Sequence, residues 1–236
     1  FSDKVINNQW GVKMLKAIGG LILLGLFLVF LIFNTPVTQL GSGFLIGDGQ
    51  YVFTYYKLVK KAKVLSVKFP NEDDIEANLL FVDPAHNLAL LKLKQVPKVK
   101  ALPLILSANG MSPKNESVFT LGYPWTNTME DQHKLIEGTA LADTALINLK
   151  MDLDPVHSGS PLFNMKQEVV GMVLLEVHAK SVFPVEGSHH FAIPKLLLDN
   201  AMKAGKMDKI IRPVQNLSRE PFILKSRNNI VLIEAR

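Results

Sequence analysis

The stretch GSGFLIGDGQYVFT occupies residues 41–54 and predicts a β-hairpin. Its two arms are short runs rich in aliphatic, aromatic and β-branched residues, which favour strands. Gly47, Asp48 and Gly49 separate the arms. Glycine adopts positive φ without steric cost, so this sequence suits a tight turn between antiparallel strands. The folded part of the chain is therefore expected to begin with antiparallel β-structure.

Similar apolar runs recur along the chain between glycine, proline and asparagine residues. Most are shorter than typical helices, and many short strands with turn signals predict a mainly β fold, either a barrel or a sandwich. The expected strands are GSGFLI (41–46), YVFTYY (51–56), VLSVKF (64–69), LALLKL (88–93), SVFTLGY (117–123) and VVGMVLLEV (169–177).

One helix is expected after Pro194, because proline suits the first turn of a helix. Leu197, Leu198 and Ala201 repeat at helical spacing, and Gly205 is a typical stop signal.

Residues 17–33 read AIGGLILLGLFLVFLIF and contain no charged side chain. No face of this segment is polar, in contrast to most buried helices of globular proteins. A cleaved signal peptide is the alternative, but the run is longer than a usual signal core and lacks a small-residue cleavage site. We therefore expect a transmembrane α-helix over residues 15–35, in contact with membrane lipid through residues 17–33.

The orientation of this helix follows from the lysines around it. Lys4, Lys13 and Lys16 precede or begin the apolar run, whereas residues 34–56 contain no lysine or arginine. Positive charge is enriched on the cytoplasmic side of spanning helices. Residues 1–14 are thus expected in the cytoplasm, and the main domain outside it, which in a bacterium means an inner-membrane anchor and a periplasmic domain.

The composition excludes several classes of function. The 236 residues are 48% hydrophobic, which is enough for a substantial core, and they include no cysteine. Disulfides, thiolate metal sites and a cysteine nucleophile are therefore excluded. The net charge is +5, but acidic and basic residues alternate without the aromatic residues of a nucleic-acid groove. No nucleic-acid partner is expected.

Seven short motifs stand out along the chain: GSGFLIGDGQYVFT (41–54), DPAHNLALLKL (83–93), LGYPW (121–125), EGTALA (137–142), DPVHSGSPLFN (154–164), EVVGMV (168–173) and FAIP (191–194). Over about residues 41–200 the chain resembles the HtrA/Deg branch of the trypsin-like serine proteases, in which such motifs occur in this order. The resemblance implies a trypsin-like double β-barrel, expected over residues 36–205, with the active site between the barrels. That family usually has an additional strand before the position of Gly41, and a PDZ domain for which residues 206–236 are too few.

The resemblance also assigns the catalytic positions. Ser158 lies in HSGSPL, where the family reads NSGGPL, so the nucleophile is retained. Lys57 stands at the histidine position and Asn87 at the aspartate position, and Val156 replaces a glycine that usually shapes the oxyanion loop. A serine without an imidazole base is a poor nucleophile, and asparagine supplies no charge to stabilise an imidazolium. These departures predict a pseudoprotease.

An active enzyme with an atypical base is the main alternative. A lysine can act as general base when its surroundings favour the neutral amine, so a Ser158–Lys57 dyad is chemically feasible. Lys57, however, lies near Lys60 and Lys61, which predicts a solvated basic stretch, and Val156 would still alter the oxyanion loop.

The histidines are expected to be inert. His86 and His157 adjoin catalytic positions, but both are predicted to be ordinary surface or loop residues. His178, His189 and His190 have metal-type side chains, yet consecutive strand residues face opposite sides and no acidic residue has suitable spacing. We therefore expect no metal and no cofactor.

The C-terminal tail contains two apolar runs, Phe222–Leu224 and Ile230–Ile233, separated by Asn228-Asn229. This pattern predicts a β-hairpin that is too small to be stable alone. Two interpretations stay open: an interface for another chain, or a strand pair that closes the chain's own barrel.

Three functions are consistent with these observations. The first is a membrane-anchored, inactive scaffold or binding module within a cell-envelope complex, with other envelope or membrane proteins as partners. The second is a membrane-bound serine endopeptidase that uses Ser158 and Lys57. The third is a quality-control adaptor that holds extended peptides by strand addition.

Overall fold

The computed structural model describes residues 14, 16–27, 38–69, 73–109, 115–123, 133–142, 146–153, 157–175, 190–207 and 217–236. The chain divides into two units, Phe1–Val37 and Thr38–Arg236. In the first unit residues 16–27 are helical. Within the described part of the chain, no helix is both long and apolar enough to cross a membrane. Residues 28–35 of the predicted span lie outside the described part.

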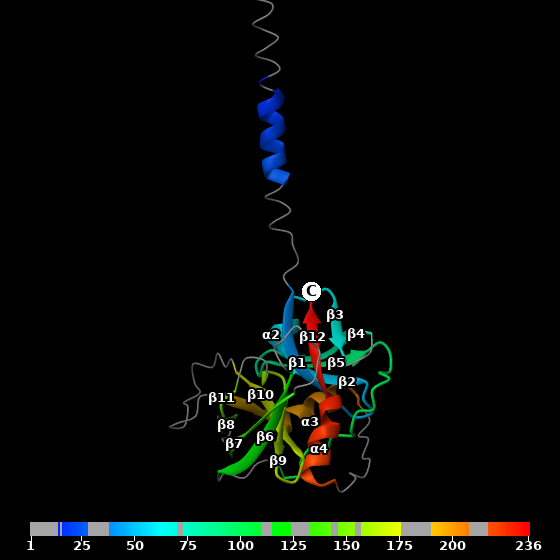
Figure 1. Cartoon of the computed structure of the whole chain (residues 1–236), viewed down its shortest axis with the longest axis vertical. Helices are drawn as coiled ribbons and strands as arrows, with labels where there is room; N and C mark the ends of the chain where they lie inside the picture. The colour runs from blue at the N-terminus through cyan, green and yellow to red at the C-terminus, as the bar shows by residue number, and fades with distance from the viewer. Residues whose placement is uncertain are drawn as a thin grey trace, which may run out of the picture. The chain divides into compact units, whose positions relative to one another are not determined.

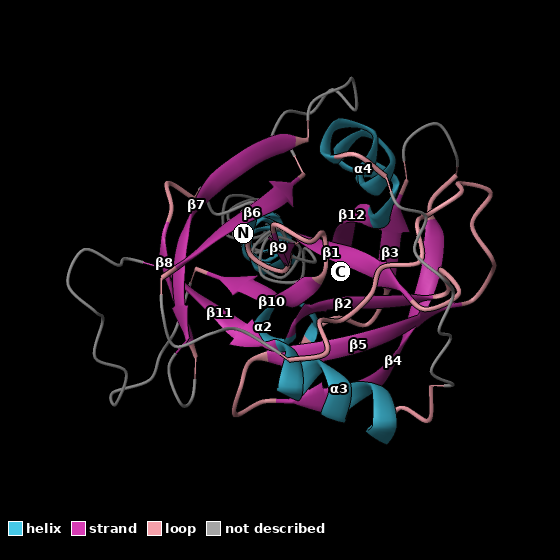
Figure 2. Ribbon diagram, turned by 90° about the horizontal axis from the view of Figure 1, so that it is seen from below, coloured by secondary structure: helices cyan, strands magenta, loops and turns pink. Residues whose placement is uncertain are grey.

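The second unit forms two closed barrels of six antiparallel strands each within the described residues, which confirms the mainly β, double-barrel prediction (Figure 2). The strand order is β1-β12-β3-β4-β5-β2 in the first barrel and β10-β11-β8-β7-β6-β9 in the second. The first barrel contains β1 (Gln39–Ile46), β2 (Tyr51–Tyr55), β3 (Leu65–Lys68), β4 (Ile75–Asp83), β5 (Leu88–Leu93) and β12 (Ile230–Ala235). The second contains β6 (Glu116–Gly122), β7 (Lys134–Ala142), β8 (Ile147–Lys150), β9 (Pro161–Asn164), β10 (Val169–Leu174) and β11 (His190–Pro194). The helices of this unit are α2 (Tyr56–Val59), α3 (Lys195–Ala204), α4 (Arg219–Ser226) and the short 3₁₀ helix η2 (Arg227–Asn229).

The predicted hairpin is formed by β1 and β2. Gly47 and Gly49 have φ values of 70° and 87°, which explains why glycine flanks the turn on both sides. Asp48 accepts a hydrogen bond from the main-chain N–H of Gln50 through its carboxylate, at 2.9 Å. The turn is therefore held by its own residues.

The two faces of this hairpin serve two different cores. Leu45 pairs with Val52 and fills the first barrel, whereas Phe44 pairs with Phe53 and joins the core between the barrels. The two phenylalanine rings lie 5.6 Å apart. Alternation of side chains along a strand produces this division, so one hairpin contributes to both the barrel interior and the contact between barrels.

Helix α3 begins directly after Pro194 and ends at Gly205, as the sequence predicts. Its buried side chains, Leu198 and Ala201, lie in the core between the barrels. The helix contacts β4 and β5 of the first barrel and β10 and β11 of the second. It therefore bridges the two barrels.

The C-terminal segment differs from the predicted hairpin. Residues 219–226 form helix α4 instead of a first strand. The reason is tertiary packing, because Phe222 is buried edge-on against the rings of Phe119 and Phe163 in the second barrel. We expected the domain to end at residue 205 and to be followed by a separate tail. This boundary is corrected, because helix α4 packs within the domain.

Strand β12 lies between β1 and β3 and hydrogen-bonds to both (Figure 1). Ile230, Val231 and Ile233 are fully buried. Of the two interpretations left open for the tail, closure of the chain's own barrel is the one observed for β12. The compact unit accordingly extends to Arg236.

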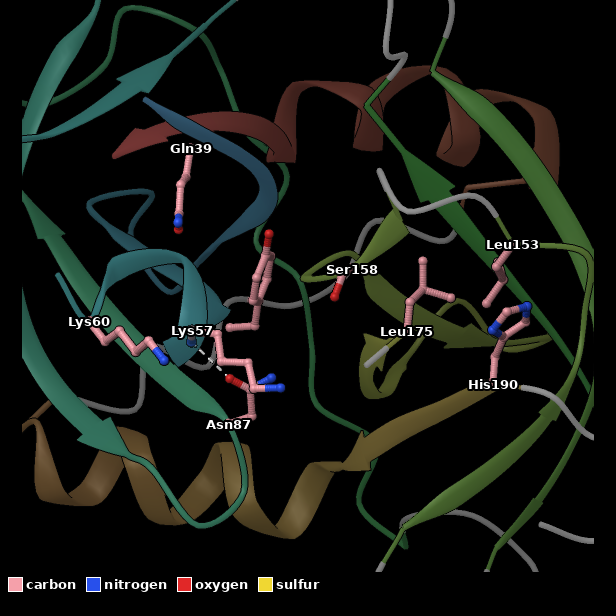
Figure 3. A pocket seen from close by; sticks show the side chains of 9 residues that line it. Gln39, Lys57, Lys60, Asn87, Leu153, Ser158, Leu175 and His190 are labelled. Carbon is pink, nitrogen blue, oxygen red and sulfur yellow. Dashed lines mark hydrogen bonds between the residues drawn. The ribbon is translucent and has the colours of Figure 1, made fainter. Parts of the chain in front are cut away.

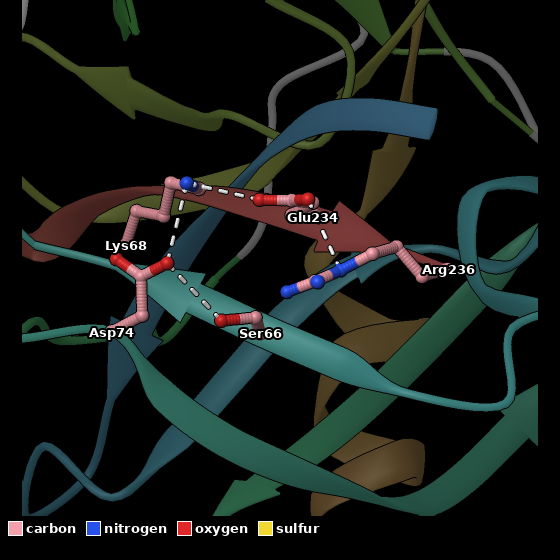
Figure 4. A network of polar contacts seen from close by, with 5 residues as sticks. All are labelled: Ser66, Lys68, Asp74, Glu234 and Arg236. Carbon is pink, nitrogen blue, oxygen red and sulfur yellow. Dashed lines mark hydrogen bonds and ion pairs between the residues drawn. The ribbon is translucent and has the colours of Figure 1, made fainter. Parts of the chain in front are cut away.

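A polar network crosses from β12 to β3 on the outer surface of the barrel (Figure 4). Lys68 forms ion pairs with Glu234 at 2.9 Å and with Asp74 at 3.2 Å, and Arg236 binds Glu234 at 3.1 Å. The hydrogen bond to Glu234 raises the pKa of the Lys68 ammonium. Surface ion pairs contribute only about 0–1 kcal/mol each, so the buried aliphatic side chains of β12 provide most of the stability.

Asn229 holds the start of β12 from inside the molecule. Its side chain is buried and makes three hydrogen bonds. The amide oxygen accepts from the N–H of Leu102 at 2.9 Å, and the amide nitrogen donates to the carbonyls of Leu102 at 2.8 Å and Leu45 at 3.2 Å. Asn229 thereby joins β12 to β1 and to the segment that connects the barrels.

Replacing Asn229→Ala should lower the free energy of unfolding by about 3 kcal/mol, because each buried polar group left without its partner costs about 1–3 kcal/mol. Asn228→Ala is the matched control, since the Asn228 side chain makes one exposed hydrogen bond, to the carbonyl of Lys100. The control should change stability by less than about 1 kcal/mol. Urea denaturation measures both values, and equal losses would show that the buried network does not hold β12.

Candidate active-site pocket

A pocket of about 580 Å³ lies between the two barrels (Figure 3). It brings together three of the four predicted site residues, Lys57, Asn87 and Ser158. The fourth, Val156, lies outside the described residues. The first barrel and its α2 segment contribute Gln39, Tyr55, Lys57, Lys60 and Asn87, and the second barrel contributes Leu153, Ser158, Leu175 and His190.

Asn87 lies in the turn between β4 and β5 with a φ of 54°, a left-handed conformation that asparagine tolerates better than most residues. Its side-chain oxygen accepts a hydrogen bond from the main-chain N–H of Lys57 at 2.8 Å. Its main-chain carbonyl accepts from the N–H of Tyr56 at 3.0 Å. Asn87 therefore caps the first turn of α2 and holds Lys57 at the edge of the pocket.

Lys57 differs from the predicted solvated charge. Its terminal nitrogen is buried, whereas Lys60, Lys61 and Lys63 are exposed as expected. Helix α2 packs on β1, β2 and β5, which turns one side of this basic stretch inward. Figure 3 shows the side chains of Lys57 and Asn87 on the same wall of the pocket.

Ser158 is buried at the start of a tight turn. The next residue, Gly159, has a φ of 92°, and its N–H donates to the carbonyl of Val173 at 2.9 Å. A Cβ atom on Gly159 would overlap the carbonyl oxygen of Ser42 in β1, which also accepts a hydrogen bond from the Thr54 hydroxyl at 2.8 Å. The turn that carries Ser158 in the second barrel therefore packs directly against the β1–β2 hairpin of the first barrel.

The two histidines beside the catalytic positions behave differently. His86 is exposed, as expected for a surface residue, and its ring Nδ1 lies at hydrogen-bonding distance from the Asp83 carboxylate, 2.6 Å. His157 lies in a turn, within the prediction of a surface or loop residue, but its side chain is completely buried and not at the surface. Its ring lies so close to Gly122 of β6 that no Cβ would fit there. His157 therefore packs behind the serine turn as an internal residue.

The opposite wall of the pocket carries two leucines that the sequence did not single out, together with His190 of the predicted histidine group. Leu153 and Leu175 follow the ends of β8 and β10, and His190 begins β11 (Figure 3). Their only common property is a position at a strand end facing the other barrel, which local sequence does not reveal. His178 and His189 of the predicted histidine group lie outside the described residues.

The chemistry available at this pocket follows from its residue types. A serine hydroxyl is present, but the positions beside it carry an amide that is engaged with the backbone and an amine in place of an imidazole. The described walls offer hydrogen-bond donors, positive charge and an apolar surface. Residues of these types can hold a ligand through hydrogen bonds, charge and apolar contact.

Comparison with known proteins agrees with this architecture. The family description "Trypsin-like peptidase domain" matches residues 41–172. A probable periplasmic serine endoprotease DegP-like of Pseudomonas putida is 33% identical over 144 residues, which cover 57% of this chain and 28% of that protein. A protein of the same description from a Marinomonas species is 27% identical over 210 residues, covering 83% of this chain and 43% of that protein.

An uncharacterized protein, y4bJ, of Sinorhizobium fredii is 29% identical over 153 residues, which are 62% of this chain and 24% of that protein. The chain thus spans less than half the length of these relatives. The chain belongs to the trypsin-like peptidase family, and within it to the HtrA/Deg-like group.

Gly159→Ala should destabilise the protein by about 3 kcal/mol or more, because the substitution combines backbone strain at positive φ with overlap against Ser42. Gly49→Ala is the control. Gly49 has a similar φ of 87°, but a Cβ atom added there would lie 4.0 Å from the Cβ of Ala101, which is an ordinary contact distance. The control should lose only about 1 kcal/mol. Thermal and urea unfolding measure the loss of stability in each variant. Equal losses would mean that the turn at Gly159 does not depend on its close packing against Ser42 of β1.

Proposed function

We propose that this chain is a catalytically inert HtrA-like protein, a pseudoprotease, whose pocket between the barrels binds extended polypeptides within a cell-envelope complex. The observation that carries the proposal is the hydrogen bond from the Lys57 N–H to Asn87. At the position that the resemblance assigns to the orienting aspartate, a neutral amide caps α2 instead. Catalysis by a serine hydroxyl requires a base and an orienting carboxylate that this arrangement lacks.

The proposed location is the outer face of the bacterial inner membrane. Two observations support it: the lysines that precede the apolar segment over residues 17–33, and the word periplasmic in the names of the DegP-like relatives. The apolar segment acts as a single spanning helix in this proposal, with residues 1–14 in the cytoplasm. The barrels then face the periplasm, where other envelope or membrane proteins are the partners.

A second function is favoured by one specific observation. Lys57 lines the same pocket as Ser158, and its terminal nitrogen is buried; a lysine amine near a serine hydroxyl is a residue pair that can form a catalytic dyad. The alternative is therefore a membrane-bound serine endopeptidase with Lys57 as the base.

A fluorophosphonate probe distinguishes these functions. An inert protein should show no covalent labelling, because labelling requires a base that removes the proton of the Ser158 hydroxyl. The double substitution Lys57→His with Asn87→Asp is the informative variant, since it restores the residue types of the family; it should label faintly at most. Labelling of the unaltered chain that disappears in both Ser158→Ala and Lys57→Met would instead establish the endopeptidase.

Topology is tested with a reporter fused after Arg236, so that the first barrel stays complete. Alkaline phosphatase in this position should be active and green fluorescent protein dark, because the barrel domain is proposed to be exported. A variant should then reverse the charge difference across the apolar segment. It combines Lys13→Gln and Lys16→Gln with two lysines inserted after residue 35, and its phosphatase activity should be severalfold lower. Bright cytoplasmic fluorescence from the unaltered chain would contradict the proposed orientation.

A further inference from the structure

The pocket carries positive charge on the wall formed by the first barrel, where Lys57 and Lys60 lie. No aspartate or glutamate is among the described residues that line the pocket. Asp83, the acidic residue nearest to Asn87 in the chain, is already paired with His86 at 2.6 Å. The described pocket thus presents cationic groups without a carboxylate among its lining residues, and an incoming anion would be attracted to it.

Burial of the Lys57 side-chain nitrogen strengthens its electrostatic effect on a ligand. The terminal nitrogen of Lys57 is buried, while Lys60 is exposed at the rim. An interaction with a buried charge is weakened less by water and salt than one on an open surface. Asn87 and Ser158 line the same cavity, and both have groups that can donate hydrogen bonds to an oxygen anion.

The facing wall, which also carries Ser158 and His190, presents two leucine side chains. Leu153 and Leu175 lie opposite the lysines in Figure 3. The volume of about 580 Å³ is in the range of sites for small ligands, so the pocket accommodates one or two residues of an extended chain. The ligand must therefore present an anionic group and an apolar side chain within one residue of each other.

The C-terminal residue of a polypeptide has this combination, because its α-carboxylate and its side chain branch from the same carbon. Building on the proposed peptide-binding function, we infer that the pocket binds the free carboxyl end of an extended polypeptide whose last residue is apolar. Lys57 and Lys60 face the carboxylate, and Leu153 and Leu175 contact the last side chain. An internal aspartate or glutamate supplies the same carboxylate chemistry, but its side chain is the anion itself.

The test measures binding of fluorescent hexapeptides to the full chain in detergent by fluorescence polarisation. The first probe is an alanine-rich peptide that ends in leucine with a free carboxylate, the second is its C-terminal amide, and the third is an amide with an internal glutamate. The free acid should bind at least about tenfold more tightly than either amide, the effect expected of one charge-assisted hydrogen bond. The affinity should fall as salt is added.

Variants of the chain assign the effect to residues. Lys57→Met should remove most of the preference for the acid over the amide, whereas Lys57→Arg should keep part of it. Lys61→Met is the matched control, because Lys61 is exposed and does not line the pocket; it should leave the preference unchanged. The comparison of the three peptides on the unaltered chain does not depend on whether these variants fold.

Each outcome has a defined meaning. Equal binding of the acid and both amides would overturn the carboxylate inference and leave the proposed peptide binding intact. Tight binding of the glutamate-containing amide would overturn the assignment to a chain end, because a side-chain carboxylate would then suffice. Failure of all three peptides to bind would overturn the inference and the proposed function together.

Discussion

The insertion of β12 between β1 and β3 is the contact on which the rest of the domain depends. It closes the first barrel and gives β1 a hydrogen-bonded neighbour on each side. Because β1 is fixed in this way, the Ser42 carbonyl is positioned to pack closely against Gly159, and Phe44 is positioned to join the core between the barrels. The position of Ser158 is therefore determined by a strand from the far end of the sequence.

The pocket brings together the positions of a trypsin-like site, and some of its residues have structural roles. Asn87 still lies beside the position of Lys57, but its amide caps a helix turn. His157, next to the serine, is buried against Gly122 and supports the turn from within. Residues at such positions can stabilise the fold whatever the chemistry of the site, because function depends on the site and not on the architecture.

The sequence predicts those parts of the structure that depend on local patterns. The β1–β2 hairpin and α3 are encoded by glycine turns, side-chain alternation and a proline start, and all three signals are short-range. Ordered motifs likewise locate Lys57, Asn87 and Ser158. Helix α4 was mistaken for a strand because its short apolar run is compatible with both, and only the distant rings of Phe119 and Phe163 decide between them. The burial of Lys57 and His157 also depends on neighbours that lie far away in the chain.

Closure of a barrel by a distant strand affects how the protein is made. Asn229 and its partner Leu45 are 184 positions apart, and every strand of the second barrel is synthesised between them. While the ribosome extends the chain, β1 and β3 expose free edges that can pair with other chains. The nascent protein therefore has a long period of vulnerability to misassembly, during which a holding chaperone or rapid folding of the second barrel would protect it.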